Sequence, residues 1–402
     1  MADANRGQLS YTKETAWGDI PEAALTDLRF NSESFSHNVA TTESEEIRSD
    51  RQTTDLVQTG ADSNGGYNFE LSYEAPPDDL LAGALWAAAW IGVGGTTTTT
   101  ITAGSGAGTE DIALAATGNT ITLGSSITHD IVAGQWIKLT GFDANDGFHF
   151  VTLVAGDVIT VEALSTTGAK ASAATITGSR LRNGVTEHSF TFQRQLADAV
   201  QFFAYRGQVC NEFSMSASAE SIVTGSLNFE GGSVASTDIK QTSYGAGANI
   251  AAPSNDVMNA VANVAQIREG GSAVAAGLFI QELSFSLQNN VRAIKAIGTL
   301  GNADVGVGKC QITGNLNTLF NDETLYEKFL ASTGSSLSFK IADAATDALS
   351  NAYIIDFPNI KFESDDGGKI GGSNQDVTEN LSWKALRHST YDCMMQICKF
   401  TV

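Results

Sequence analysis

Two glycine-rich segments are the first places in this chain where residue types and spacing could support chemistry. Gly104-Ser105-Gly106-Ala107-Gly108 and Gly306-Val307-Gly308-Lys309 have the composition of loops that cradle a phosphate. The first lacks both the spacing of a third glycine and a following helix. The second has Ala303 where the first glycine is required and Cys310 where serine or threonine is required. Both segments are therefore predicted to be turns.

The other candidate chemical groups are isolated histidines and adjacent acids. The pairs Asp78-Asp79 and Asp365-Asp366 could bind calcium or act in glycoside cleavage, but adjacent carboxylates in such segments are usually solvated. No Gly-x-Ser-x-Gly elbow of a hydrolase occurs. No histidine has a second ligand at the spacing of a zinc site; the five are His37, His129, His149, His188 and His388. The sequence therefore predicts no catalytic residue, no metal site and no cofactor.

The clearest structural signal is a short motif that occurs twice. Thr224-Gly225-Ser226-Leu227-Asn228 recurs as Thr313-Gly314-Asn315-Leu316-Asn317, and each copy follows a segment with alternating polarity. Alternation is typical of a strand with one buried face. For residues 208–217 and 221–230, a short link predicts a hairpin with Val209, Phe213, Met215, Val223, Leu227 and Phe229 on its apolar face. Its polar face would carry Cys210, Glu212, Ser214, Ser216, Thr224, Ser226, Asn228 and Glu230.

Residues 281–288 and 310–317 repeat this plan with a longer link. Their polar face would carry Glu282, Ser284, Ser286, Gln311, Thr313, Asn315 and Asn317. Both polar faces consist of short neutral side chains with a few glutamates, and residues 207–239 contain no lysine or arginine. Two interpretations remain open: a sandwich that exposes one face to water, or a wall that faces something negatively charged.

The composition limits the class of protein. With 402 residues and 42% apolar content, the chain can form one large domain or two to three ordinary ones. A net charge of −22 argues against a protein that binds nucleic acid by neutralising phosphates, and most acidic excess serves solubility. The four cysteines follow no C-x-x-C pattern and are predicted to be reduced core residues. We expect no secretion signal at the N-terminus and no membrane span, because residues 80–93 are too short to cross a bilayer.

Residues 96–180 differ in composition from the rest of the chain. They are rich in threonine and glycine, with short β-branched runs at 120–123, 136–139, 148–153 and 158–161. We therefore expect an inserted all-β domain. Elsewhere we expect helices after Asp78-Asp79 and at 322–330. We also expect three final strands, at 337–341, at 352–357 with 361–363 beyond Pro358, and at 394–402. Residues 41–66 are predicted to be a loop that is either free or in contact with a neighbouring subunit.

Several short motifs, in this order, resemble one family. They are Trp17-Gly18-x-x-Pro21, Ser44-Glu45-Glu46-Ile47-Arg48-x-Asp50-Arg51, a Thr-Gly-x-Leu strand, and Asn374-Gln375-Asp376-Val377 with Leu381-Ser382-Trp383-x-Ala385-Leu386. The series resembles the major tail tube protein of long-tailed (siphovirus-like) bacteriophages. The resemblance covers residues 1–95 and 181–402, and the insertion at 96–180 resembles the extra β domain that many members carry outside the tube.

The resemblance implies a mainly β fold: a tail-tube-type β-sandwich or barrel with a flanking α-helix and an inserted small all-β domain. It implies a structural protein without enzymatic activity, in which six copies form a ring and stacked rings enclose a negatively charged channel for viral DNA. By carry-over, the channel would be lined by Glu212, Ser214, Ser216, Thr224, Ser226, Asn228 and Glu230, although only some of the four strands need face it. The loop between rings would contain Glu45, Glu46, Arg48, Asp50 and Arg51.

The implied partners are further copies of the chain, the tape measure, the tail terminator and the tail tip. DNA would pass through without specific binding, and no membrane insertion is expected. The protein would be made in the host cytoplasm and end in the virion tail. The alternative is a capsid decoration or tail-tip adhesin protein that binds a host surface, and an enzyme such as a glycan depolymerase ranks third.

Overall fold

The computed structural model describes residues 3–19, 23–104, 112–170, 173–232, 235–274, 278–344, 349–368, 370 and 372–402. Strands dominate these ranges, and the α-helices within them are α1 (Asp78–Leu85) and α2 (Thr324–Leu330). The strand pairs are antiparallel, which confirms the predicted mainly β fold. Short 3-10 helices occur at Ala4–Arg6, Asp143–Asn145, Ala197–Ala199 and Ser236–Asp238.

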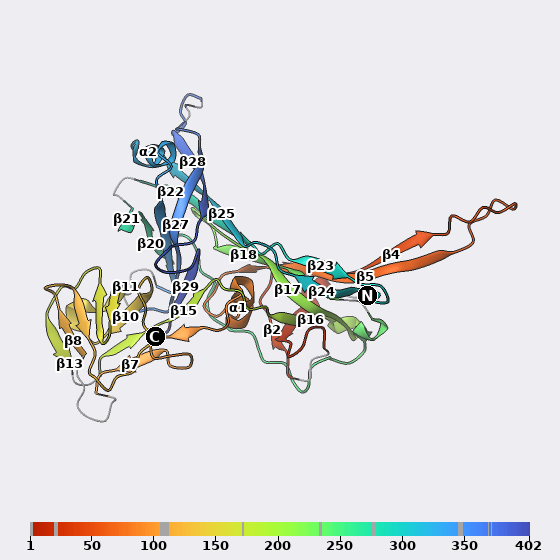
Figure 1. Cartoon of the computed structure of the whole chain (residues 1–402), viewed down its shortest axis with the longest axis horizontal. Coiled ribbons are helices and arrows are strands. Elements are labelled where there is room, and N and C mark those ends of the chain that lie inside the picture. Colours follow the sequence, from red (N-terminus) through yellow and green to blue (C-terminus); the bar gives the residue numbers. More distant parts are fainter. Residues whose placement is uncertain are drawn as a thin grey trace.

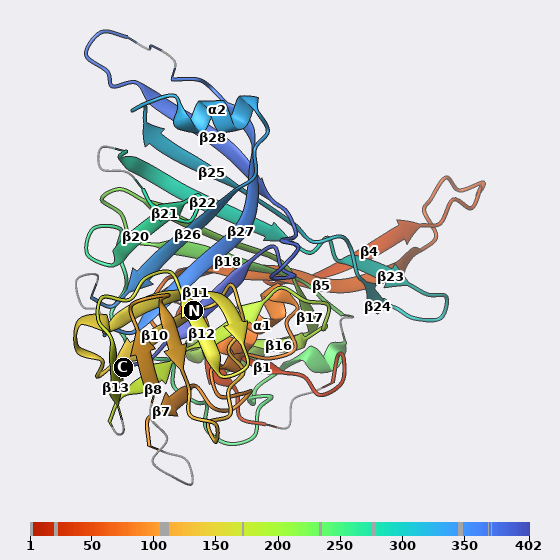
Figure 2. The same ribbon diagram turned by 60° about the vertical axis from the view of Figure 1, so that its left-hand side comes forward.

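Seven strands pair side by side in what we call the front sheet (Figure 2). Each strand pairs antiparallel with the next, and the short strand β3 (Ser32–Glu33) pairs with one edge strand, β5. Because successive side chains of a strand point to opposite faces, one face of this sheet contributes to the core and the other does not. In order, the seven strands are β5 (Leu56–Glu70), β18 (Thr224–Glu230), β17 (Gln201–Ser218), β22 (Ile280–Gln288), β25 (Gln311–Leu319), β28 (Thr378–Ala385) and β27 (Ala352–Asp365).

A second layer packs against the apolar face of the front sheet. It contains β1 (Gly7–Lys13) with β16 (Ser189–Leu196), β20 (Val264–Glu269) with β26 (Ser335–Ala342), and β15 (Ser179–Arg182) with β29 (Gln396–Phe400). The main hydrophobic core joins residues of both layers and of α1, including Leu9, Leu80, Phe192, Phe213, Phe339 and Trp383. Further two-residue strands are β2 (Thr26–Asp27), β6 (Ile91–Gly92), β19 (Ile239–Lys240) and β21 (Ser272–Ala273).

The long strands β17 and β27 belong to both layers. The first part of β17 pairs with β16 and its second part with β18, while β27 pairs first with β26 and then with β28. Both strands have register shifts near the change of partner, and such bulges bend a strand. One shift, between Cys210 and Glu212, overturns part of the predicted alternation: Cys210 is fully buried in the core and is absent from the polar face.

The region predicted as a loop at 41–66 is mostly a β-hairpin. β4 (Ser36–Glu43) pairs with the first half of β5, and only residues 44–55 at the tip lie outside the strands. This part of the hairpin exposes polar side chains on both faces. Its sequence therefore lacks the alternation of apolar and polar residues that predicts a strand. A second hairpin, β23 (Arg292–Lys295) and β24 (Asn302–Gly306), lies beside it (Figure 1). The Lys295 Nζ lies 2.9 Å from a carboxylate oxygen of Asp62 across the two hairpins.

Eight strands between residues 100 and 177 form a separate sheet (Figure 1). The four predicted strands are present as β9 (Thr120–Thr122), β10 (Trp136–Thr140), β11 (Gly147–Ala155) and β12 (Val158–Val161). The others are β7 (Thr100–Thr102), β8 (Ile112–Ala115), β13 (Gly168–Lys170) and β14 (Thr175–Thr177). This sheet has its own apolar core, and Trp136 packs with Phe400 in a further cluster against the main body.

The C-terminal part contains one strand more than predicted. The three expected strands correspond to β26, β27 and β29, whereas β28 was not predicted although Leu381 and Trp383 alternate with polar residues there. Both helices lie where they were expected. All four cysteines are free thiols, but only Cys210, Cys393 and Cys398 are buried as predicted, and Cys310 is half-buried. Within the described ranges, no helix has the length and apolar character needed to cross a membrane.

Candidate functional site

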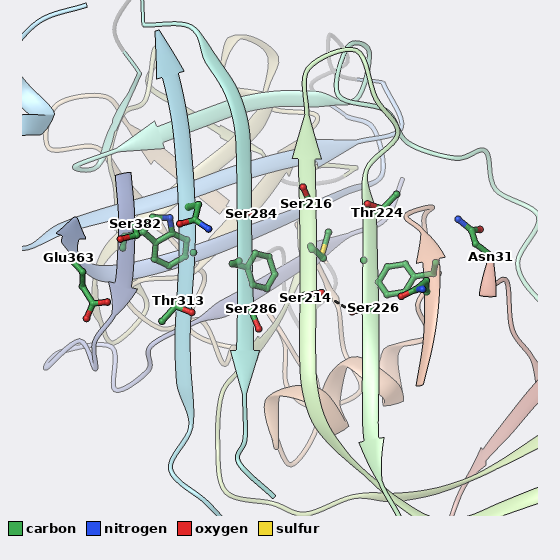
Figure 3. Close-up of a pocket in the computed structure, with 18 residues that line it drawn as sticks. Asn31, Ser214, Ser216, Thr224, Ser226, Ser284, Ser286, Thr313, Glu363 and Ser382 are labelled. Carbon is green, nitrogen blue, oxygen red and sulfur yellow. Dashed lines mark hydrogen bonds between the residues drawn. The ribbon is translucent and has the colours of Figure 1, made fainter. Parts of the chain in front are cut away.

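A polar hollow runs across the front sheet on the face opposite the core (Figure 3). Hydroxyl side chains of neighbouring strands stand opposite one another in rows. One row joins Ser226, Ser214 and Ser286, which belong to β18, β17 and β22. A second row joins Thr224, Ser216 and Ser284 on the same three strands. The rows continue to Asn68 on β5, to Thr313 and Asn315 on β25, and to Ser382 on β28.

The residues predicted as channel-lining lie on this face, and none of them is buried. Four of them, Ser214, Ser216, Thr224 and Ser226, line the hollow itself. Glu212 and Asn228 form the next row along the strands, and Glu230 follows at the end of β18. The alternating residues Phe213, Met215, Leu227 and Phe229 are buried on the other face, as predicted.

The two copies of the repeated motif share this face. Ser226 of the first copy and Thr313 of the second both line the hollow, separated by β17 and β22. Both copies therefore lie on the same face of the front sheet.

Hydrogen bonds connect the polar rows. The Oγ atoms of Ser214 and Ser226 lie 2.8 Å apart. The Glu212 carboxylate accepts a hydrogen bond of 2.9 Å from Ser286 Oγ on β22 and one of 3.3 Å from Asn228 Nδ2 on β18. Glu212 therefore joins the first pair of motif strands to the second.

The glycines of the motif have a packing role. A Cβ atom at Gly225 would lie 2.5 Å from Cζ of Phe69, the residue opposite it on β5. A Cβ atom at Gly314 would overlap the indole of Trp383, the residue opposite it on β28. Each glycine thus leaves room for an aromatic ring from the next strand, and such cross-strand contacts stabilise a sheet.

The hollow has few positive charges. The four motif strands contain no lysine, and their single arginine, Arg206, lies in the first half of β17 and pairs with Asp238 at 2.8 Å. Positive charge enters with β27 and β28, which carry Lys361 and Lys384. The Lys384 Nζ lies 3.7 Å from the carboxylate of Glu363, which also lines the hollow.

Sequence reasoning missed the contributions of β5, β27 and β28 to the hollow. Asn31, Asn68, Glu363 and Ser382 lie on segments far from the motif in sequence. Only the alternation around Leu381 and Trp383 could have revealed β28, and pairing between distant strands leaves no local signal. Strand pairing therefore decides the extent of the site.

The predicted loop residues lie together at the tip of the β4–β5 hairpin. Glu45, Glu46, Arg48, Asp50 and Arg51 are all exposed there. The Arg48 guanidinium lies 2.9 Å from the Asp50 carboxylate of the same tip, so Arg48 has a partner within its own chain.

The groups first considered for chemistry contact backbone or other side chains. Each histidine ring lies within hydrogen-bonding distance of backbone groups, as in the 2.6 Å contact of His188 Nε2 with the Ala87 oxygen. Asp78 pairs with Lys399 at 2.8 Å. Within the described ranges, no group of three or more His, Cys, Asp and Glu side chains could hold a metal ion. Gly306 to Lys309 lead into strand β25, and of the segment 104–108 only Gly104 lies within the described residues.

The sequence model of a family described as phage tail tube protein matches residues 4–385. The chain belongs to the phage tail tube protein family. The match extends over nearly the whole chain and confirms the resemblance drawn from the short motifs. This tail tube protein is therefore a structural component of a virion tail. The search of curated proteins found no match for the chain.

Proposed function

We propose that this tail tube protein forms closed rings whose lumen is lined by the polar face of the front sheet. Stacked rings would form the conduit through which viral DNA enters the host. The observation that carries this proposal is the face itself: seven paired strands present rows of small polar side chains opposite an apolar core.

The edges of the front sheet support ring closure. In the described part of the chain, β28 is the only strand that pairs with residues 361–365 of β27. At the other edge, β3 pairs with β5 only through two residue pairs, at Tyr67 and Asn68 of β5. Unpaired edges invite further pairing, and a closed barrel removes them. Pairing of one edge with the opposite edge of the next copy gives a ring when the rotation closes. The family resemblance implies six copies of the tube fold around it.

The chemistry of the face suits passage of DNA without capture. Each lysine or arginine that neutralises a phosphate adds affinity that must be lost again when the DNA moves. The rows offer hydroxyl and amide groups together with the carboxylates of Glu212 and Glu363, so a DNA phosphate would gain little binding free energy there. Lys384 lies close to Glu363, which offsets its charge.

The β4–β5 hairpin is the candidate connection between rings. Its apolar side chains are exposed in the single chain: Ile47 fully, and Val39, Leu56 and Val57 by about half. Exposed apolar groups beside charged ones are typical of protein interfaces. We infer that Ile47 packs on the next ring while Arg51 and the acids of the tip pair with charges there. The tape measure would occupy the lumen, and the terminator and tail tip would cap the stack.

Electron microscopy of the purified protein tests the proposal. Negative staining should show hollow tubes or rings, with or without a tail initiator complex. Monomers alone at high concentration, even with the initiator complex, would contradict it.

A further inference from the structure

The chain contains the same succession of elements twice. The first series is β1, β4, a projecting hairpin tip, β5, α1, β16, β17 and β18. The second series is β20, β22, the projecting hairpin β23–β24, β25, α2, β26, β27 and β28. The eight-stranded sheet interrupts only the first series, between α1 and β16.

Both series are arranged in space in the same way. In the front sheet the first series runs β3 or β4, β5, β18, β17, and the second runs β22, β25, β28, β27. Corresponding strands also run in the same direction, because every neighbouring pair is antiparallel. In the second layer, β1 pairs with β16 as β20 pairs with β26, and α1 contacts β17 as α2 contacts β27. The two units therefore follow one another along the sheet in the same orientation, like neighbours in a ring.

Individual residues match as well. Thr224–Glu230 aligns with residues 378–384, so that Leu227 corresponds to Leu381 and Phe229 to Trp383, all four buried. The row Gly66, Asn228, Glu212 of the first unit corresponds to the row Asn315, Ser382, Ser364 of the second, because the bulge between Cys210 and Glu212 matches the bulge between Phe362 and Ser364. The side chains of Asn228 and Glu212 are hydrogen-bonded to each other, and so are those of Ser382 and Ser364.

The structurally equivalent strands are not the strands that carry the repeated sequence motif. The Thr-Gly-x-Leu-Asn copies lie on β18 and β25, but β18 corresponds to β28 and β25 to β5. The short motif therefore does not mark the duplication, which is visible only in strand order and register.

We propose that the chain is a tandem of two tube units and that residues 364–368 pair with residues 34–38 of the next chain. This rests on the proposed ring. The junction inside the chain supplies the register: Glu212 on β17 stands opposite Gln288 on β22. Ser364 corresponds to Glu212, and Asn38 corresponds to Gln288, because Ser36 faces Asn64 as Ser286 faces Thr313. Ser364 of one chain thus stands opposite Asn38 of the next, and both are exposed in the single chain. A ring of six tube units then contains three chains instead of six.

Disulfide trapping tests this pairing. Directly opposed residues of antiparallel strands lie about 4.5–5.5 Å apart at Cα, within the range of a disulfide. In one chain, Asn38 and Ser364 lie at opposite edges of the sheet, about 30 Å apart at the usual strand spacing, so they cannot bridge internally. Oxidised tubes of the double variant Asn38→Cys, Ser364→Cys should give a covalent ladder that ends at three chains on a non-reducing gel.

The matched control is Ser214→Cys with Ser286→Cys, which should bridge within the chain and leave a monomer band. Either single variant, at position 38 or at position 364, should give no ladder. A ladder that ends at six chains would overturn the tandem ring, and tubes without any ladder would overturn the edge pairing. If the double variant forms no tubes, the rotational symmetry of unaltered tubes in cryo-electron microscopy decides: threefold supports the inference and sixfold overturns it. If the unaltered protein forms no tubes, the proposed function itself fails.

Discussion

Trp383 packs its indole ring into the space that a side chain at Gly314 would occupy on the neighbouring strand. Phe69 and Gly225 are arranged in the same way at the other end of the motif strands. The glycine of each motif copy is therefore explained by the core, whereas the residues on either side of it face the polar hollow.

Gly314→Ala should destabilise the unassembled chain by about 1–3 kcal/mol, because the added methyl group overlaps Trp383 in a packed core. Urea unfolding followed by tryptophan fluorescence measures the loss. Gly168→Ala is the matched control, since Gly168 also lies in a strand but has open space around it and an ordinary backbone conformation. Equal stability of the two variants would show that packing of the Trp383 indole does not require a glycine at position 314.

Ser214→Lys should leave tubes intact but slow the release of DNA from virions, because an ammonium group would then reach into the lumen and attract phosphates. Ser226→Lys and Asn228→Lys should act in the same direction. Ser214→Gln, which is long but uncharged, should release DNA at the normal rate. Ejection kinetics at low salt give the largest difference, since screening weakens the attraction. Normal kinetics for all three lysine variants would place these strands outside the lumen.

The free energy of unfolding should depend on pH through Asp356, which is buried. Burial raises the pKa of Asp356 from 3.8 to about 7, although Arg268 and Arg182 lower it in part. The folded chain therefore holds a proton that the unfolded chain releases, so stability is greatest below pH 4 and falls as pH rises to about 7. The total effect is of order 4 kcal/mol. Asp356→Asn should reduce this slope in urea titrations across the range by the Asp356 contribution, and an unchanged slope would contradict the assignment.

Replacing residues 96–177 by a short linker should still give tubes. Gly92 and Ser179 stand opposite each other in the pair β6–β15, so the two ends of the insertion already meet. The variant should be less stable, because Phe400 loses its contacts with Trp136 and Phe148. The cost is about 1.5–3 kcal/mol for exposing such a ring. A chain that folds but does not assemble would show that the eight-stranded sheet takes part in the tube.

Ile47→Asp should prevent stacking while leaving rings, because Ile47 is the most exposed apolar side chain of the β4–β5 tip. Val185→Asp is the control, as Val185 is also strongly exposed but lies outside both hairpins. Sedimentation velocity separates single rings from stacks. Tubes of normal length from the Ile47 variant would rule out this tip as the connector.

Local patterns predicted the β-rich fold, both helices and the polar face of β17 and β18, because alternation and helix start signals lie within a few residues. They failed where structure depends on distant partners. Residues 41–66 were predicted to be a loop because the hairpin strands there expose polar side chains on both faces. Cys210 was placed on the wrong face because one extra residue at a bulge reverses the alternation. The duplication escaped notice because corresponding residues, such as Glu212 and Ser364, occupy the same position in the sheet although the sequences around them differ.

A cryo-electron microscopy map of assembled tubes tests the central claim most directly. We predict that the inner wall is a closed barrel in which Ser214, Ser226, Ser286 and Thr313 point toward the axis. A map in which these side chains face outward, or in which another surface of the chain encloses the channel, would contradict the account.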